Sequence, residues 1–152
     1  MKSEGIDHVA IIVRDIDQAV QSLSKLFEME FEEIPWAKDR MGMRISIILP
    51  DGQVELISVV DASKAAKMPP PFNEIAEFSE KRGEGIYNLF LRVKDADQAV
   101  ADAKKKGVRI AQIIEEKGLG TIIPHFKEVF FAEEDLPFKR ISMVWRDSEG
   151  RG

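Results

Sequence analysis

The fold of this chain is decided by a stretch that occurs twice. Residues 5–20 read GIDHVAIIVRDIDQAV, and residues 85–100 read GIYNLFLRVKDADQAV. Eight of the sixteen aligned pairs are identical at a constant offset of 80 residues. Self-similarity over such a length is typical of a duplicated structural unit. We therefore expect two related modules in one chain.

Each copy is predicted to begin with a strand and to continue into a helix. Val9–Val13 and Leu89–Val93 are short apolar runs of strand length. Asp15 and Asp95, or the aspartates two residues further on, stand where a side chain can accept hydrogen bonds from the first N–H groups of a helix. The identities between the copies cluster at this point, where a strand would lead into a helix.

Three further strands are predicted in each copy. The first copy has a Pro50-Asp51-Gly52 turn between two apolar runs, which is a strong hairpin signal. The predicted strands are Met29–Ile34, Met43–Leu49 and Val54–Val60 in the first copy, and Arg109–Ile114, Lys127–Ala132 and Arg140–Trp145 in the second. The sequence thus predicts an α+β protein of two tandem βαβββ modules.

The predicted domain organisation is a single domain over residues 1–152. Module 1 covers about residues 5–60, a linker about 61–84, and module 2 about 85–147. The linker contains three consecutive prolines, residues 69–71, which cannot donate backbone hydrogen bonds to a sheet. A short helix is expected after them, over Asn73–Lys81.

Composition excludes several classes of protein. No apolar run approaches the ~20 residues that a membrane span needs, and acidic Glu4 and Asp7 stand where a signal peptide would be apolar. The formal net charge of −5 opposes binding to nucleic acid. The absence of cysteine excludes disulfides and thiolate metal sites and is compatible with a reducing compartment. We expect a cytoplasmic protein whose partner is a small molecule.

The repeat, its histidine-bearing first strand and the Val54-Glu55-Leu56-Ile57 strand resemble the vicinal oxygen chelate superfamily. That superfamily includes glyoxalase I, extradiol dioxygenases, bleomycin-resistance proteins and methylmalonyl-CoA epimerase. Residues 78–86, FSEKRGEGI, are most similar to the epimerase branch. The resemblance implies a curled-sheet cleft for a small organic molecule, the glyoxalase-like fold, and a homodimer.

The resemblance also implies a metal site. Its four ligand positions, in the first and last strand of each module, fall on His8, Glu55, Asn88 and Ser142. The family usually has a second histidine in place of Asn88 and a carboxylate in place of Ser142, so the site for a divalent ion (Zn, Co, Ni, Mn or Fe) is weakened. Two alternatives stay open: Glu55 forms an ion pair with Arg92 or Arg140 instead, and His125 either replaces a lost ligand or is an exposed loop residue.

Two functions follow from the resemblance. The first is a metal-assisted isomerase or lyase of the methylmalonyl-CoA epimerase or lactoylglutathione lyase type, acting on an acyl-CoA or 2-oxo ligand. The two epimerase bases, however, correspond to Ser142 and to a position near Arg40, and neither side chain is a base at neutral pH. The second is a metal-free binding or sequestering protein of the bleomycin-resistance type. The predicted ligand-binding residues are Arg92, Arg140, Phe90 and Met43.

Overall fold

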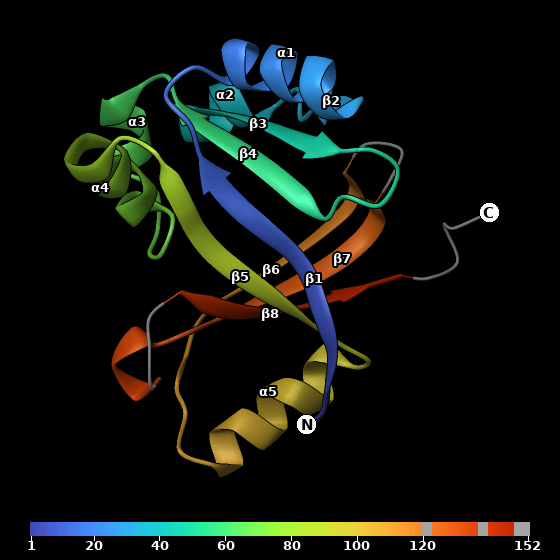
Figure 1. Cartoon of the computed structure of the whole chain (residues 1–152). Coiled ribbons are helices and arrows are strands. Elements are labelled where there is room, and N and C mark those ends of the chain that lie inside the picture. The colour runs from blue at the N-terminus through green and yellow to red at the C-terminus, as the bar shows by residue number, and fades with distance from the viewer. Residues whose placement is uncertain (120–122, 137–139, 148–152) are drawn as a thin grey trace. The chain divides into compact units, whose positions relative to one another are not determined.

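The computed structural model of the chain describes residues 1–119, 123–136 and 140–147. The elements follow one another in the order β1 (Ser3–Ile12), α1 (Ile16–Phe27), β2 (Phe31–Glu33), α2 (Ala37–Met41), β3 (Met43–Ile48), β4 (Val54–Val59), α3 (Ala62–Ala66), α4 (Asn73–Arg82), β5 (Gly85–Val93), α5 (Ala96–Lys105), β6 (Ile110–Leu119), β7 (Ile123–Phe131), the 3₁₀ helix η1 (Glu133–Asp135) and β8 (Ile141–Arg146). Figure 1 shows this order along the chain. None of the helices described is both long and apolar enough to cross a membrane.

The chain divides into two compact units. Unit 1 comprises Met1–His8 and Asn88–Gly152, and unit 2 comprises Val9–Tyr87. The boundaries fall inside β1 and β5, so the first eight residues are grouped with the second copy of the repeat. The partition into one domain of two modules and a linker stays a prediction.

Unit 2 contains the strands β2, β3, β4 and the end of β1, in that order across the sheet. β3 and β4 are antiparallel around the predicted Pro50-Asp51-Gly52 turn, which Gly52 N closes by donating to Ile48 O at 2.8 Å. β1 runs parallel to β4. Helix α1 covers one face of this sheet (Figure 1). Ile16 at its start packs against Val13 and Leu56.

Unit 1 repeats this arrangement with the strand order β5-β8-β7-β6. β5 is parallel to β8, and β8, β7 and β6 are antiparallel neighbours. Helix α5 covers one face through a cluster of buried side chains: Val93, Ala96, Ala99, Val129 and Met143. Both units therefore have the predicted βαβββ order.

The strand register confirms the equivalence of the two copies. Ala10 of β1 is paired with Glu55 of β4, and Phe90 of β5, 80 residues after Ala10, is paired with Ser142 of β8. The positions of Glu55 and Ser142 are thus equivalent, as predicted. The helix starts are also equivalent, because the Asp15 side chain accepts from Gln18 N and the Asp95 side chain accepts from Gln98 N.

Several element boundaries differ from the sequence prediction. β6 extends to Leu119, well beyond the predicted end at Ile114. Its polar half stays paired with β7, and its side chains alternate between exposed and half-buried. β2 is only three residues long. The short helices α2 and α3 were not predicted, since five residues are too few to show helical periodicity.

Candidate ligand-binding face

The candidate site lies on the sheet face of unit 1 opposite α5. Successive side chains of a strand point to opposite faces. Val93 and Met143 pack against α5, so the residues that alternate with them lie on the other face. We call this side the polar face; its residues from β5 and β8 are Asn88, Phe90, Arg92, Ser142 and Arg146.

One buried carboxylate connects three basic side chains at this face. Asp7 is completely buried. Its Oδ2 accepts from Arg92 Nε at 2.8 Å, and its Oδ1 accepts from Arg146 Nη2 and lies 2.7 Å from His8 Nδ1. A buried carboxylate is stable only when it is paired and hydrogen-bonded in this way.

The same contacts explain the acidity of Asp7. Burial alone would raise its pKa, because the charged form loses water. The hydrogen bond from His8, the charge of Arg146 and the hydrogen bond from Arg92 outweigh burial and lower the pKa of Asp7 to about 2. Asp7 is therefore an anion at any physiological pH.

The His8 ring makes contacts through its face as well as through its edge. It stacks on Phe90 with ring centroids 4.0 Å apart and planes inclined by 13°. Its Nε2 lies 3.9 Å from Glu128 Oε1, which is outside hydrogen-bonding range. Phe90 in turn meets Phe130 edge to face. The predicted ligand-binding residue Phe90 is thus the packing support of His8.

The predicted ligand positions Asn88 and Ser142 are hydrogen-bonded to each other. Asn88 Nδ2 donates to Ser142 Oγ at 3.1 Å, and both residues are buried, at 6% and 2% exposure. The other amide atom, Asn88 Oδ1, is buried and has no hydrogen-bond donor among the described residues. A buried carbonyl oxygen without a donor is rare in native proteins and calls for a ligand or a water molecule.

We expect Ser142→Ala to lower the free energy of unfolding by about 1–3 kcal/mol, because it leaves the buried Asn88 amide without its acceptor. The control is Ser46→Ala, since Ser46 is buried to 5% exposure and its hydroxyl makes no hydrogen bond within the described residues. Urea unfolding of the two variants measures the difference. Equal losses would show that the amide and hydroxyl do not depend on each other.

Arg92 borders a cavity of about 270 Å³ at the end of the polar face. Lys94, Arg146 and Trp145 also line it, together with the carboxylates of Glu4 and Asp147. Apart from the bond from its Nε to Asp7, Arg92 makes no hydrogen bond within the part of the chain that the structure describes. Its two terminal nitrogens are therefore available to an oxygen of a ligand.

Three further predicted residues are described within their own units. Glu55 belongs to unit 2, where it faces away from α1 because Val54 and Leu56 on either side of it pack toward that helix. Arg140 forms an ion pair with Glu133, Nη1 to Oε1, at 3.6 Å. Met43 is completely buried and belongs to the core of its unit, so its prediction as a ligand contact is wrong.

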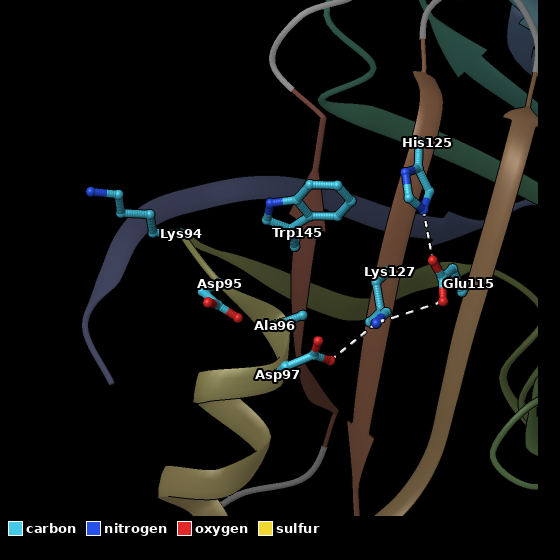
Figure 2. A pocket seen from close by; sticks show the side chains of 8 residues that line it. All are labelled: Lys94, Asp95, Ala96, Asp97, Glu115, His125, Lys127 and Trp145. Atoms are coloured by element: carbon cyan, nitrogen blue, oxygen red, sulfur yellow. Dashed lines mark hydrogen bonds and ion pairs between the residues drawn. The ribbon is translucent and has the colours of Figure 1, made fainter.

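His125 lies on the opposite face of the unit 1 sheet from Ser142. It is adjacent to Phe126, which pairs with Arg146 of the polar face, so His125 points to the other side. There its Nε2 lies 2.7 Å from Glu115 Oε1 and its ring meets Trp145 edge to face (Figure 2). His125 therefore does not replace a ligand beside His8, and that alternative is wrong.

The ligand set of the polar face does not fit a tightly held divalent ion. Asn88 and Ser142 supply only a neutral amide and a hydroxyl, which bind each other. Such groups compensate little charge compared with imidazole and carboxylate. In the described ranges, no three His, Asp or Glu side chains form a group that could hold an ion.

Asp7 and Arg146 are the site residues that sequence reasoning missed. Alternation along β1 puts Asp7 on the opposite strand face from His8. The sequence therefore gave no reason to pair Asp7 with Arg92 or Arg146. The available signal was the charge of the predicted face itself. A partly buried arginine is commonly paired with a carboxylate, and Asp7 is the acidic residue beside His8.

Comparison with known proteins identifies the family of the chain. Residues 7–123 match the family model of the Glyoxalase/Bleomycin resistance protein/Dioxygenase superfamily. This range is more than half of the chain, so the chain belongs to that superfamily. No curated protein sequence matches it.

Solved structures resemble the chain over nearly its whole length. Methylmalonyl-CoA epimerase from Mycobacterium tuberculosis has 25% identity and a TM-score of 0.71, covering 97% of this chain and 91% of that one. A Streptomyces coelicolor methylmalonyl-CoA epimerase in complex with 2-nitronate-propionyl-CoA has 20% identity and a TM-score of 0.70, with 95% and 98% covered. A hypothetical protein from Bacillus halodurans has 18% identity and a TM-score of 0.67, with 99% of each chain covered. The chain therefore has the α+β, glyoxalase-like fold.

Proposed function

We propose that the protein binds a small organic molecule on the polar face of unit 1 without coordinating a divalent ion there. The observation that carries this proposal is the hydrogen bond between Asn88 and Ser142. It joins the two positions at which a chelating protein of this fold would need charged or imidazole ligands. An amide and a hydroxyl are instead suited to hydrogen bonding with a neutral or anionic organic group.

The chemistry of the face indicates the ligand class. Asn88 Oδ1 requires a donor, such as a hydroxyl or N–H group. The terminal nitrogens of Arg92 require an acceptor, and a carboxylate or a polarised carbonyl fits a guanidinium well. An acyl thioester or a 2-oxo acid offers such carbonyl and carboxylate oxygens. The epimerase complex of similar fold contains an acyl-CoA analogue, which makes acyl-CoA the first class to test.

The second candidate function is a metal-assisted isomerase or lyase. The hydrogen bond between Asp7 and His8 favours it, because histidine ligands of metal ions commonly have their other ring nitrogen bound to a carboxylate. In that case a bound ion would polarise a carbonyl of the ligand. The predicted homodimer and cytoplasmic location accompany either function as predictions.

Metal titration distinguishes the two candidates. Zn²⁺ and Co²⁺ are titrated calorimetrically into the protein and into the His8→Ala variant, with His125→Ala as a control on the opposite face of the sheet. We expect that replacing His8 causes no loss of a stoichiometric ion, because Asn88 and Ser142, at the two predicted ligand positions of unit 1, are a neutral amide and a hydroxyl. One tightly bound ion per chain that His8→Ala abolishes and His125→Ala retains would establish the second candidate instead.

Ligand titration tests the binding function directly. Methylmalonyl-CoA and propionyl-CoA serve as probes, and Arg92→Met is compared with Arg109→Met, whose arginine is exposed and paired with Asp135. We expect Arg92→Met to weaken the carboxylate-bearing probe at least tenfold, about 1.4 kcal/mol, and Arg109→Met to change nothing. If neither probe binds the unmodified protein, acyl-CoA is not the ligand class.

A further inference from the structure

We infer that Asp7 is a positioning residue of the polar face: it fixes His8 in the tautomer that carries its proton on Nδ1, and it orients the guanidinium of Arg92 for the ligand. The second half of this inference rests on the proposed function, because it assigns Arg92 to ligand binding. The first half concerns the histidine alone and can be tested without any ligand.

The tautomer follows from the hydrogen-bond inventory of Asp7. An ionised carboxylate can only accept hydrogen bonds. Two arginines donate to the buried Asp7 carboxylate, as expected of its ionised form, so the proton in the 2.7 Å contact belongs to His8 Nδ1. A neutral imidazole with its proton on Nδ1 has a lone pair on Nε2. His8 therefore acts as an acceptor, and not as a donor, at Nε2.

Glu128 and the two arginines are the other charged groups near this histidine. Glu128 Oε1 lies 3.9 Å from Nε2, and Arg92 and Arg146 both donate to the Asp7 carboxylate.

The consequence for Arg92 is geometric. Asp7 binds the guanidinium at Nε, and Nη1 and Nη2 make no hydrogen bond within the described residues. Asn88 Oδ1 is an unsatisfied acceptor on the same face. The polar face thus presents an acceptor at Asn88 and donors at the terminal nitrogens of Arg92. It fits a ligand that carries a hydroxyl, enol or N–H group together with a carboxylate or carbonyl group.

The second histidine of the chain provides an internal reference. His125 contacts Glu115 through Nε2 and not Nδ1, at 2.7 Å, and Lys127 joins Glu115 to Asp97 in the same row of side chains (Figure 2). The hydrogen bond from His125 lowers the pKa of Glu115, so Glu115 is also an acceptor. The two histidines are therefore expected to be opposite tautomers, His8 protonated on Nδ1 and His125 on Nε2.

Long-range ¹H–¹⁵N correlation spectra of the ¹⁵N-labelled protein measure the two tautomers. The chain contains only two histidines, and the spectrum of His125→Gln assigns the remaining signal to His8. In the pH range where imidazole is neutral, we expect the Nδ1–H pattern for His8 and the Nε2–H pattern for His125. An Nε2–H or doubly protonated His8 in the unmodified protein would overturn the inference.

Two matched variants test the cause. Asp7→Asn should change the tautomer pattern of His8 and leave that of His125 unchanged, and Glu115→Gln should do the reverse. Asp7→Asn should also weaken methylmalonyl-CoA at least tenfold, whereas Asp135→Asn, which removes another arginine-bound carboxylate, should not. If Asp7→Asn does not fold, the spectrum of the unmodified protein still decides the tautomer, and Arg92→Met decides the binding role.

The outcomes separate the two proposals. An Nδ1–H tautomer at His8 with no binding of either acyl-CoA probe supports the positioning of His8 and contradicts the proposed ligand class. Binding that depends on Arg92 but not on Asp7 overturns the orienting role of Asp7 and leaves the proposed function intact.

Discussion

Replacing Asp7 by asparagine is expected to lower the free energy of unfolding by about 3–5 kcal/mol, the range found when one partner of a buried ion pair is removed. Arg92 and Arg146 both donate to Asp7, and an asparagine has only one oxygen with which to accept. Its NH₂ group would face a second donor. For a chain of this length the thermal midpoint should fall by roughly 6–20 °C, which calorimetry measures.

Asp135→Asn is the control for this result. Asp135 also accepts three hydrogen bonds from Arg109, and these bonds lower its pKa to about 2, as at Asp7. Arg109 is exposed, however, so water can replace the lost bonds. We expect little change in the midpoint. A loss as large as that of Asp7→Asn would mean that burial of the carboxylate is not the cause.

The effect of Asp7→Asn should also depend on pH. The pKa of Asp7 is lower in the folded chain than the value near 3.9 of an unfolded one. The folded state thus binds fewer protons, and the stability that Asp7 contributes is present above pH ~4 and is lost as the pH falls toward 2. Urea unfolding at pH 7, 5 and 3 should show the gap between protein and variant closing at the acidic end. A constant gap would contradict an ionised Asp7.

The fold could be predicted because duplication leaves a symmetric trace. A constant offset relates the two copies, and with it the pairing of β1 with β4 implies that of β5 with β8. Ala10 opposite Glu55 and Phe90 opposite Ser142 confirm this register. The resemblance to the superfamily rested on the same residues, so family and fold followed from one observation.

The candidate site was only partly predictable. The resemblance to the superfamily supplied His8, Asn88 and Ser142, and period-two alternation placed Phe90 and Arg92 on the same strand face as Asn88. His125 was misplaced because the sequence does not show where β7 begins, and a shift of one residue moves a side chain to the opposite face. Asp7 and Arg92 are 85 residues apart, and a contact over that separation leaves no periodic signal.

The equivalence of the two modules makes a prediction about their cores. Leu56 follows Glu55 and Met143 follows Ser142, so the two residues occupy equivalent positions. Leu56 is 1% exposed beneath α1, and Met143 is 3% exposed beneath α5. Each side chain fills the space between a sheet and the helix of its own module.

Leu56→Ala and Met143→Ala should therefore each lower the free energy of unfolding by about 2–5 kcal/mol, since each opens a cavity that the surrounding strands cannot close. Ile113→Ala is the control, because Ile113 is 46% exposed and its loss should change stability by no more than about 0.5 kcal/mol. Urea unfolding curves of all three variants, fitted with one common m-value, measure the change in the free energy of unfolding. A large loss for Leu56→Ala together with a loss near the control for Met143→Ala would contradict equivalent cores. Methionine and leucine fill similar volumes. Their truncation to alanine can therefore differ so widely only if one of the two helices is not packed on its sheet.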